Sequence, residues 1–86
     1  MGSKTFEGVR FSVYSHDHSP PHVHGSLSGV TLVVDLLAED EVRLSKRKDA
    51  VSPANAQKNI VARILEVAAD NMDELNVLWE KTHGKR

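Results

Sequence analysis

The spacing of apolar residues changes once along this chain of 86 residues, and this change constrains the fold more than any other feature. Near the start, Val9, Phe11 and Val13 alternate with polar residues, which is the period of a strand with one buried face. After Ser52, apolar residues recur at helical spacing. Strands first and helices last predict an α+β fold: a small antiparallel sheet of three to four strands with one or two C-terminal helices packed on one face.

We expect the strands within residues 9–46. The segments with strand-like patterns are 9–13, a short one beginning at 22–24, 30–37 and 42–45. Apolar residues occupy both faces of 30–37, so this strand is expected to lie centrally. Glycines and serines predict a turn-rich connection over 25–29, and the acidic segment 38–41 predicts a short hairpin link.

The helices are expected within residues 53–83. Ser52 followed by Pro53 is typical of an N-cap and a first helical position. The segment 71–74 resembles a capping box and predicts the start of a second helix, although the apolar stripe runs on across 68–75. Two helices and one long bent helix therefore remain alternatives, and Gly84 predicts the end of the helical region.

The length and composition favour a single α+β domain over residues 1–86. With 40% hydrophobic and 27% charged residues, the chain is expected to be globular, and its net charge of −1 gives no global argument for binding nucleic acid or a membrane. The absence of cysteine excludes disulfides and thiolate metal sites. We expect a cytoplasmic protein with no membrane partner, because no apolar stretch is long enough to span a bilayer and the N-terminus does not resemble a signal peptide.

The densest cluster of chemically reactive residues is a histidine-rich segment. Four of the five histidines, at positions 16, 18, 22 and 24, fall within nine residues. Pro20 and Pro21 stiffen the middle of this segment because each fixes φ and removes a backbone donor. If residues 22–24 are extended, His22 and His24 point to the same face.

These residues suggest a metal site. Neutral imidazole is the commonest metal ligand in proteins, and His18, His22 and His24 stand beside the carboxylate of Asp17. Three protein ligands would leave a position open for water, as in catalytic zinc sites, so a divalent transition metal is the candidate cofactor. In the alternative interpretation, Asp17 and His18 only cap a turn, and the stiff prolines only redirect the chain between two strands.

A second candidate site is the basic run that follows the last expected strand. Arg43, Lys46, Arg47 and Lys48 are candidate phosphate contacts on nucleic acid. The alternative is a solvated strand end that discourages edge pairing, which the neighbouring acidic residues favour. Trp79 is expected in the core, from where His83, one helical turn further on, would approach the histidine segment.

The segment Asp17–His24 resembles the D-H-x-P-P-H-V-H signature of a family of small prokaryotic proteins known as domain of unknown function 4160. The C-terminal region is similar to the family's closing pattern at Asn71, Leu75, Trp79, His83 and Gly84. This resemblance covers nearly the whole chain. It implies membership of a two-gene module of the toxin–antitoxin type, and so a small cognate partner protein, but it assigns no catalytic residues.

Three functions follow as expectations. The first is a toxin–antitoxin component, not necessarily an enzyme, that binds its partner through a His/Pro loop with Asp17, His18, Pro20, Pro21, His22 and His24. The second is a metal-dependent hydrolase or nuclease that uses the histidine cluster. The third is a pH- or metal-responsive binding module, and pairing of an exposed edge strand would also allow a homodimer. Convergence of His18, His22 and His24, with His83 as a further candidate, within ligand distance at the mouth of a pocket favours metal binding or catalysis. Rings that point into solvent or bond to backbone carbonyls favour recognition of a partner or a purely structural role.

Overall fold

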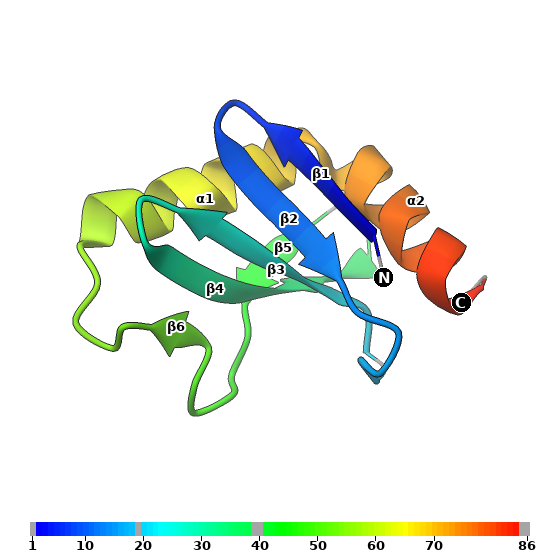
Figure 1. Ribbon diagram of the computed structural model, residues 1–86, viewed down its shortest axis with the longest axis horizontal. Helices are drawn as coiled ribbons and strands as arrows, with labels where there is room; N and C mark the ends of the chain where they lie inside the picture. The colour runs from blue at the N-terminus through cyan, green and yellow to red at the C-terminus, as the bar shows by residue number, and fades with distance from the viewer. Residues whose placement is uncertain (1, 19, 39–40, 85–86) are drawn as a thin grey trace.

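The chain folds as an antiparallel sheet covered on one face by two C-terminal helices (Figure 1). A computed structural model describes residues 2–18, 20–38 and 41–84. The elements are β1 (Gly2–Phe6), β2 (Val9–Val13), β3 (His22–Leu27), β4 (Val30–Leu36), β5 (Val42–Leu44), β6 (Val51–Ser52), α1 (Lys58–Asp70) and α2 (Met72–His83). The strand order is β1-β2-β3-β4-β5, and β6 also pairs with β4. The predicted α+β class is confirmed.

The sheet has six strands instead of the predicted three to four, because strands form outside residues 9–46. The strand β1 pairs with β2 along its whole length, but residues 3–5 are exposed and carry no alternation of apolar residues. The strand β6 contains only two residues, which pair with Thr31 and Leu32. Neither segment has a continuous buried face, so neither shows the alternation of apolar and polar residues from which a strand is predicted.

Two tight hairpins join the first four strands. The β1–β2 turn contains Glu7 and Gly8 at φ 50° and 84°, and the β3–β4 turn contains Ser28 and Gly29 at φ 51° and 81°. Positive φ at both central residues is the signature of the type I′ turn, whose twist matches that of the flanking strands. The predicted central position of the strand after this second turn is confirmed, because β4 pairs with β3 on one side and with β5 and β6 on the other.

The predicted connection over residues 25–29 is wrong in its first three residues, because β3 continues to Leu27. Gly25 lies inside this strand and is buried. A Cβ atom at this position would lie 2.8 Å from Ile64 Cγ2 and 2.9 Å from the Phe11 ring. A glycine within a strand often marks the close approach of another element, and here the helix α1 and the strand β2 occupy the space.

The first helix begins later than predicted, at Lys58 instead of residue 53. Ser52 does not cap it, because Ser52 pairs with Thr31 in the sheet and Gln57 stands at the helix N-cap. The helical region is two helices that meet at Asn71. The predicted capping box does not form, since the Asn71 side-chain amide donates to the Val67 carbonyl at 2.9 Å instead of capping α2.

The core lies between the sheet and the two helices. Alternate residues of β2, β3 and β4 meet one face of each helix. The largest fully buried side chains are Phe11, Leu32, Ile64, Leu75, Val9, Val13, Val23, Val34 and Val67. Gly84 ends α2 as predicted, with φ 81° and its N–H donating to the Glu80 carbonyl. No described helix is long and apolar enough to cross a membrane.

The pairing of β4 with two consecutive strands determines where the basic residues lie. The backbone N–H of Ser45 donates to the Val33 carbonyl, and the N–H of Val33 donates to the Ala50 carbonyl. The loop over residues 45–50 therefore begins and ends beside the same residue of β4, Val33. The predicted link 38–41 includes residues 39 and 40, which lie outside the described residues, and Leu37 N–H donates across it to the Glu41 carbonyl.

Candidate functional site

A tight turn after β2 fixes the carboxylate of Asp17. The Asp17 backbone N–H donates to the Tyr14 carbonyl at 3.0 Å, and the Tyr14 N–H donates back to Asp17 Oδ2, also at 3.0 Å. These reciprocal bonds hold the side chain, which is only 7% exposed. Asp17 thus closes a turn, as one interpretation of the sequence expects, and the same bonds aim its carboxylate at β3.

His22, the first residue of β3, presents one defined ring nitrogen to this carboxylate. Its Nδ1 lies 2.9 Å from the Pro20 carbonyl oxygen. Because a carbonyl only accepts, Nδ1 carries the hydrogen, and the Nε2 of the neutral ring has a free lone pair. That Nε2 lies 3.5 Å from Asp17 Oδ1, and it is buried with no hydrogen-bond partner among residues 2–18, 20–38 and 41–84.

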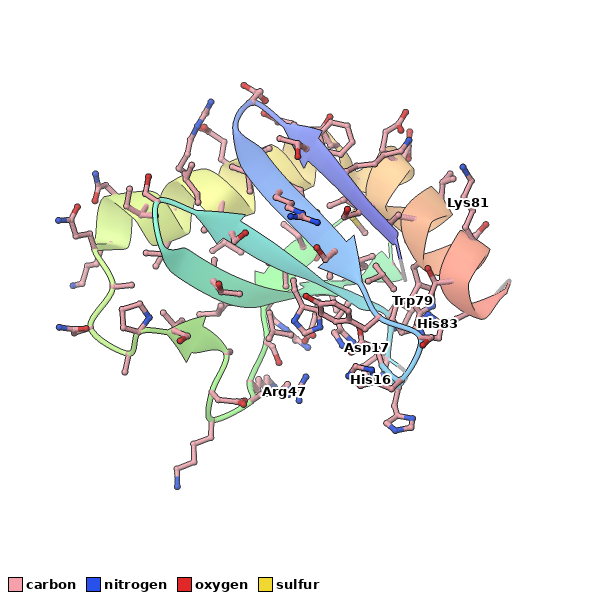
Figure 2. All side chains as sticks on the ribbon, in the orientation of Figure 1. His16, Asp17, Arg47, Trp79, Lys81 and His83 are labelled. Atoms are coloured by element: carbon pink, nitrogen blue, oxygen red, sulfur yellow. The ribbon has the colours of Figure 1, made fainter. Side chains whose placement is uncertain are left out.

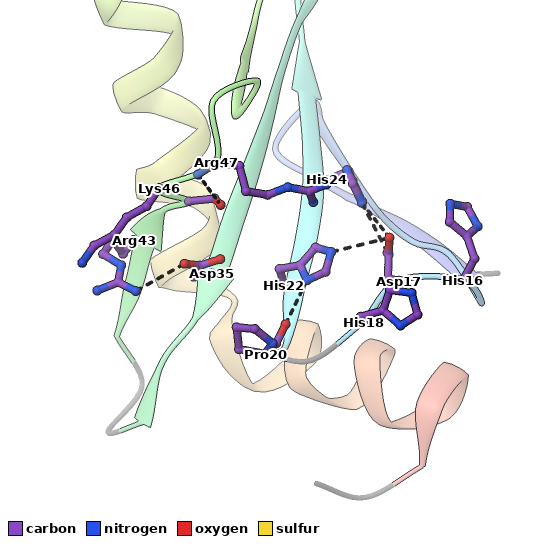
Figure 3. A pocket seen from close by; sticks show the side chains of 11 residues that line it. His16, Asp17, His18, Pro20, His22, His24, Asp35, Arg43, Lys46 and Arg47 are labelled. Carbon is purple, nitrogen blue, oxygen red and sulfur yellow. Dashed lines mark hydrogen bonds and ion pairs between the residues drawn. The ribbon is translucent and has the colours of Figure 1, made fainter.

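His24 completes a group of three potential ligands (Figure 3). Two residues along the strand, it points to the same face as His22. Its Nε2 lies 3.3 Å from both carboxylate oxygens of Asp17, and its side chain is 20% exposed. One donor atom from each of Asp17, His22 and His24 lies within 4.8 Å of the other two.

The surroundings of Asp17 favour its charged form. Partial burial raises the pKa of this carboxyl, but the hydrogen bonds from the Tyr14 backbone and the His24 ring, with the positive charge that His24 and His22 carry when protonated, lower the pKa by more. The net pKa therefore lies below its ordinary value, and Asp17 is a carboxylate at neutral pH.

Aromatic rings from the turn after β2 and from α2 pack around the two imidazoles. The Tyr14 ring lies 4.9 Å from that of His24, and the Trp79 ring lies 5.4 Å from that of His22, between ring centroids. Trp79 is 3% exposed, so the prediction that it belongs to the core is confirmed. His83 stacks on Trp79 at 3.9 Å (both labelled in Figure 2), and neither of its buried ring nitrogens has a hydrogen-bond partner within the described residues.

The three-residue group opens into a pocket of about 520 Å³. Strand register extends the site across β4 and β5, because His22 pairs with Asp35 and Asp35 pairs with Arg43. Arg43 Nη2 donates to Asp35 Oδ2 at 3.4 Å. The pocket is lined by His16, Asp17, His18, Pro20, His22, His24, Asp35, Arg43, Ser45, Lys46 and Arg47.

Several sequence-predicted site residues meet in this pocket without joining the ligand group. His18 is exposed and lines the pocket, but within the described residues the ligand group comprises only Asp17, His22 and His24. Pro20 supplies the carbonyl that orients His22, and the Pro21 carbonyl accepts from Leu36 N–H at 3.0 Å, which ties the loop to β4. Ser19 lies outside the described residues.

The basic residues divide into two groups. Arg43, Lys46 and Arg47 line the pocket; Arg43 and Lys46 lie away from Asp17, and the Arg47 side chain extends toward His24 (Figure 3). Lys48 is exposed and is not among the lining residues. The pocket also contains Asp35, which the sequence analysis does not predict as a site residue. In the sequence, Asp35 stands out only as a carboxylate within an otherwise apolar strand. The register of β3 and β4 is what makes it a neighbour of His22.

A family model described as Domain of unknown function (DUF4160) matches residues 8–80, which confirms the resemblance inferred from the histidine-rich segment. No curated protein and no solved structure matches the chain.

Proposed function

We propose that this chain, which belongs to the DUF4160 family, is a metal-dependent hydrolase whose divalent transition-metal ion is held by Asp17, His22 and His24. The observation that carries the proposal is how the two ring nitrogens of His22 are bonded. Its Nδ1–H is held by the Pro20 carbonyl, and the lone pair of the neutral ring is buried beside the Asp17 carboxylate without a hydrogen-bond partner among the described residues. An unpaired acceptor that faces a carboxylate is unfavourable unless a proton or a metal ion lies between the two, and a metal ion would also use the third donor, His24.

The distances within the group support a metal over a simple ion pair. Charge-assisted N–H···O bonds are usually about 2.7–2.9 Å long. The three contacts from Nε2 atoms to Asp17 are longer, at 3.3, 3.3 and 3.5 Å. Two ligands at about 2.0–2.1 Å from one tetrahedral zinc ion are separated by roughly 3.4 Å. Each imidazole is thus spaced from the carboxylate as two ligands of one ion would be, and all three donor atoms lie within 4.8 Å of one another.

The bonds around the ligands also fit a metal site. Metal-binding histidines commonly donate their other ring N–H to a backbone carbonyl or carboxylate, which fixes the ring orientation. His22 does this with Pro20, and the backbone of Tyr14 holds Asp17 in the same way. Both positions are therefore organised before any ion binds.

The number of protein ligands indicates which reaction the metal ion would support. Three protein ligands leave a coordination position for water, and a bound divalent ion lowers the pKa of that water to about 7. The pocket gives a substrate access to this position from the side of the sheet that carries Asp35 and Arg43. Hydrolysis is the reaction class that such an arrangement serves.

The proposed hydrolase is the second of the three functions expected from the sequence, and the toxin–antitoxin component is the first. Toxin–antitoxin function and binding of a small cognate protein stay predictions, and so do a homodimer and a pH-responsive binding role. Of the histidines expected to converge, His22 and His24 meet Asp17 at the pocket, whereas His18 stays outside the group and His22 also bonds to a backbone carbonyl. The meeting of these three residues is what supports the metal over the alternatives.

The proposal is tested on untagged protein purified without chelators or metal columns. We expect about one zinc, manganese, iron or nickel ion per chain, together with hydrolysis of activated aryl esters or aryl phosphates that a chelator abolishes and the metal restores. His22→Ala and Asp17→Asn are expected to lose both properties, whereas His16→Ala is the control, because it removes a pocket histidine outside the ligand group. A metal-loaded parent without chelator-sensitive hydrolysis, or equal metal content in His22→Ala, would overturn it.

A further inference from the structure

We infer that the substrate of this centre is a phosphate ester, held between the ligand group and a basic wall formed by Arg43, Lys46 and Arg47. The inference rests on the proposed function and identifies its substrate class. Figure 3 shows Arg43 and Lys46 on the side of the pocket away from Asp17, while the Arg47 side chain extends toward His24. A ligand that bridges the ligand group and the basic wall must offer several anionic oxygens.

The sign of the charge in the pocket opposes that of the whole chain. The chain carries a net charge of −1, yet the pocket is lined by three cationic side chains against the two carboxylates of Asp17 and Asp35. A bound divalent ion makes the pocket more positive still. Positive charge gathered in a concave site attracts an anion and disfavours a cationic substrate.

Contacts with residues of the sheet and its edge hold Arg43 and Arg47 of the basic wall in place. Asp35 is buried, and the Arg43 side chain that it binds at 3.4 Å is 47% exposed, so the guanidinium retains donors for a ligand. The backbone N–H of Arg47 donates to Ser45 Oγ at 3.2 Å, which fixes the start of the loop beside β4. Arg47 Nε lies 3.9 Å from Asp49 Oδ1, a weak contact that a ligand can displace.

A phosphate ester fits this combination better than a carboxylate does. A phosphoryl group presents several acceptor oxygens, so one can approach the metal position while others accept from a guanidinium or an ammonium group. Metal ions and basic side chains together are the usual means of stabilising a phosphoryl group during transfer. In the reaction, the oxygen of water forms a new bond to phosphorus, the P–O bond to the ester oxygen breaks, and the leaving alcohol takes up a proton.

The test uses the protein loaded with Co²⁺, whose visible spectrum reports its coordination. Inorganic phosphate is added as the probe, and bis(4-nitrophenyl) phosphate, 4-nitrophenyl phosphate and 4-nitrophenyl acetate are compared as substrates. Phosphate is expected to change the spectrum and to inhibit hydrolysis of the aryl phosphates. A short single-stranded oligonucleotide then distinguishes a nucleic-acid phosphodiester from a small phosphate ester as the source of this chemistry.

Lys46→Ala and Lys48→Ala are a matched pair. Each removes one positive charge from the same loop, but only Lys46 lines the pocket. We expect Lys46→Ala to weaken phosphate binding about tenfold, the size of one lost charge-assisted hydrogen bond, and Lys48→Ala to change it by less than about twofold. Both variants should bind Co²⁺ as the parent does.

The outcomes separate the two proposals. If Co²⁺ binds and the acetate ester is cleaved, but phosphate leaves the spectrum unchanged, the substrate inference is wrong and the hydrolase survives. If Lys46→Ala and Lys48→Ala weaken phosphate equally, diffuse charge and not the basic wall attracts the anion, and the inference is also wrong. If Co²⁺ does not bind, the proposed function itself fails.

Discussion

His22 faces Asp17 with its Nε2 atom 3.5 Å from Oδ1, while its Nδ1 donates to the Pro20 carbonyl at 2.9 Å. The prolines therefore do more than stiffen the loop. The carbonyl of the first sets the tautomer of His22, and the carbonyl of the second pairs with Leu36 on β4. The His/Pro segment holds a carboxylate and two imidazole nitrogens in one place before any ligand arrives.

Zinc is expected to stabilise the parent protein against unfolding. A ligand that binds only the folded state adds about 2.7 kcal/mol when its concentration is 100 times its Kd. Thermal unfolding followed by circular dichroism should show a higher midpoint with Zn²⁺, and a chelator should reverse the change. Asp17→Asn is expected to show no increase, and a similar increase in that variant would indicate that zinc binds elsewhere.

Copper is expected to quench the fluorescence of the protein. Trp79 is the only tryptophan, and its ring lies 5.4 Å from that of His22. Cu²⁺ binds nitrogen and oxygen sites tightly and quenches a nearby indole, so one equivalent should remove most of the emission. In His22→Ala the emission should persist at the same Cu²⁺ concentration. Quenching that is equal in parent and variant would place the ion away from this histidine.

Gly25→Ala is expected to destabilise the fold by about 1–3 kcal/mol, the usual cost of overpacking a core. The new methyl group would lie 2.8 Å from Ile64 Cγ2 and 2.9 Å from the Phe11 ring. Urea unfolding measures the change. The neighbouring variant Ser26→Ala, on the opposite face of the strand, should stay within about 0.5 kcal/mol of the parent. Equal stability of the two variants would contradict the packing of α1 on β3.

Ser28→Asn is expected to stabilise the β3–β4 hairpin by about 0.5 kcal/mol. Ser28 has φ 51°, in a region that asparagine adopts more readily than serine does. Ser28→Val is the opposing control, since a β-branched side chain at positive φ should cost about 1–2 kcal/mol. Chemical denaturation of the three proteins should give that order, and a more stable valine variant would contradict the type I′ turn.

The parts of the fold that the sequence predicted are those whose burial leaves a periodic pattern. Val9, Phe11 and Val13 are all fully buried, so their alternation predicts β2 correctly. The strand β1 carries no such pattern because its middle residues are exposed. The start of α1 was misplaced because Ser52 and Pro53 are a good local signal for a helix, while the pairing of Ser52 with Thr31 depends on distant residues.

The same distinction applies to the site. Asp17, His22 and His24 could be proposed together because they stand within eight residues of one another. Asp35 could not, since it becomes a neighbour of His22 only through the register of β3 and β4. The difference between Lys46 and Lys48 likewise depends on the path of the loop along the edge of β4, which no residue pattern encodes.

The most direct measurement is a calorimetric titration of untagged, metal-free protein with Zn²⁺, with His22→Ala titrated in parallel. The parent is expected to bind one ion per chain. The variant should bind more than about 100-fold more weakly, since loss of even an outer partner of a metal ligand costs about 10–100-fold. Equal affinity of the two proteins, or no binding by the parent, would contradict a metal centre at Asp17, His22 and His24.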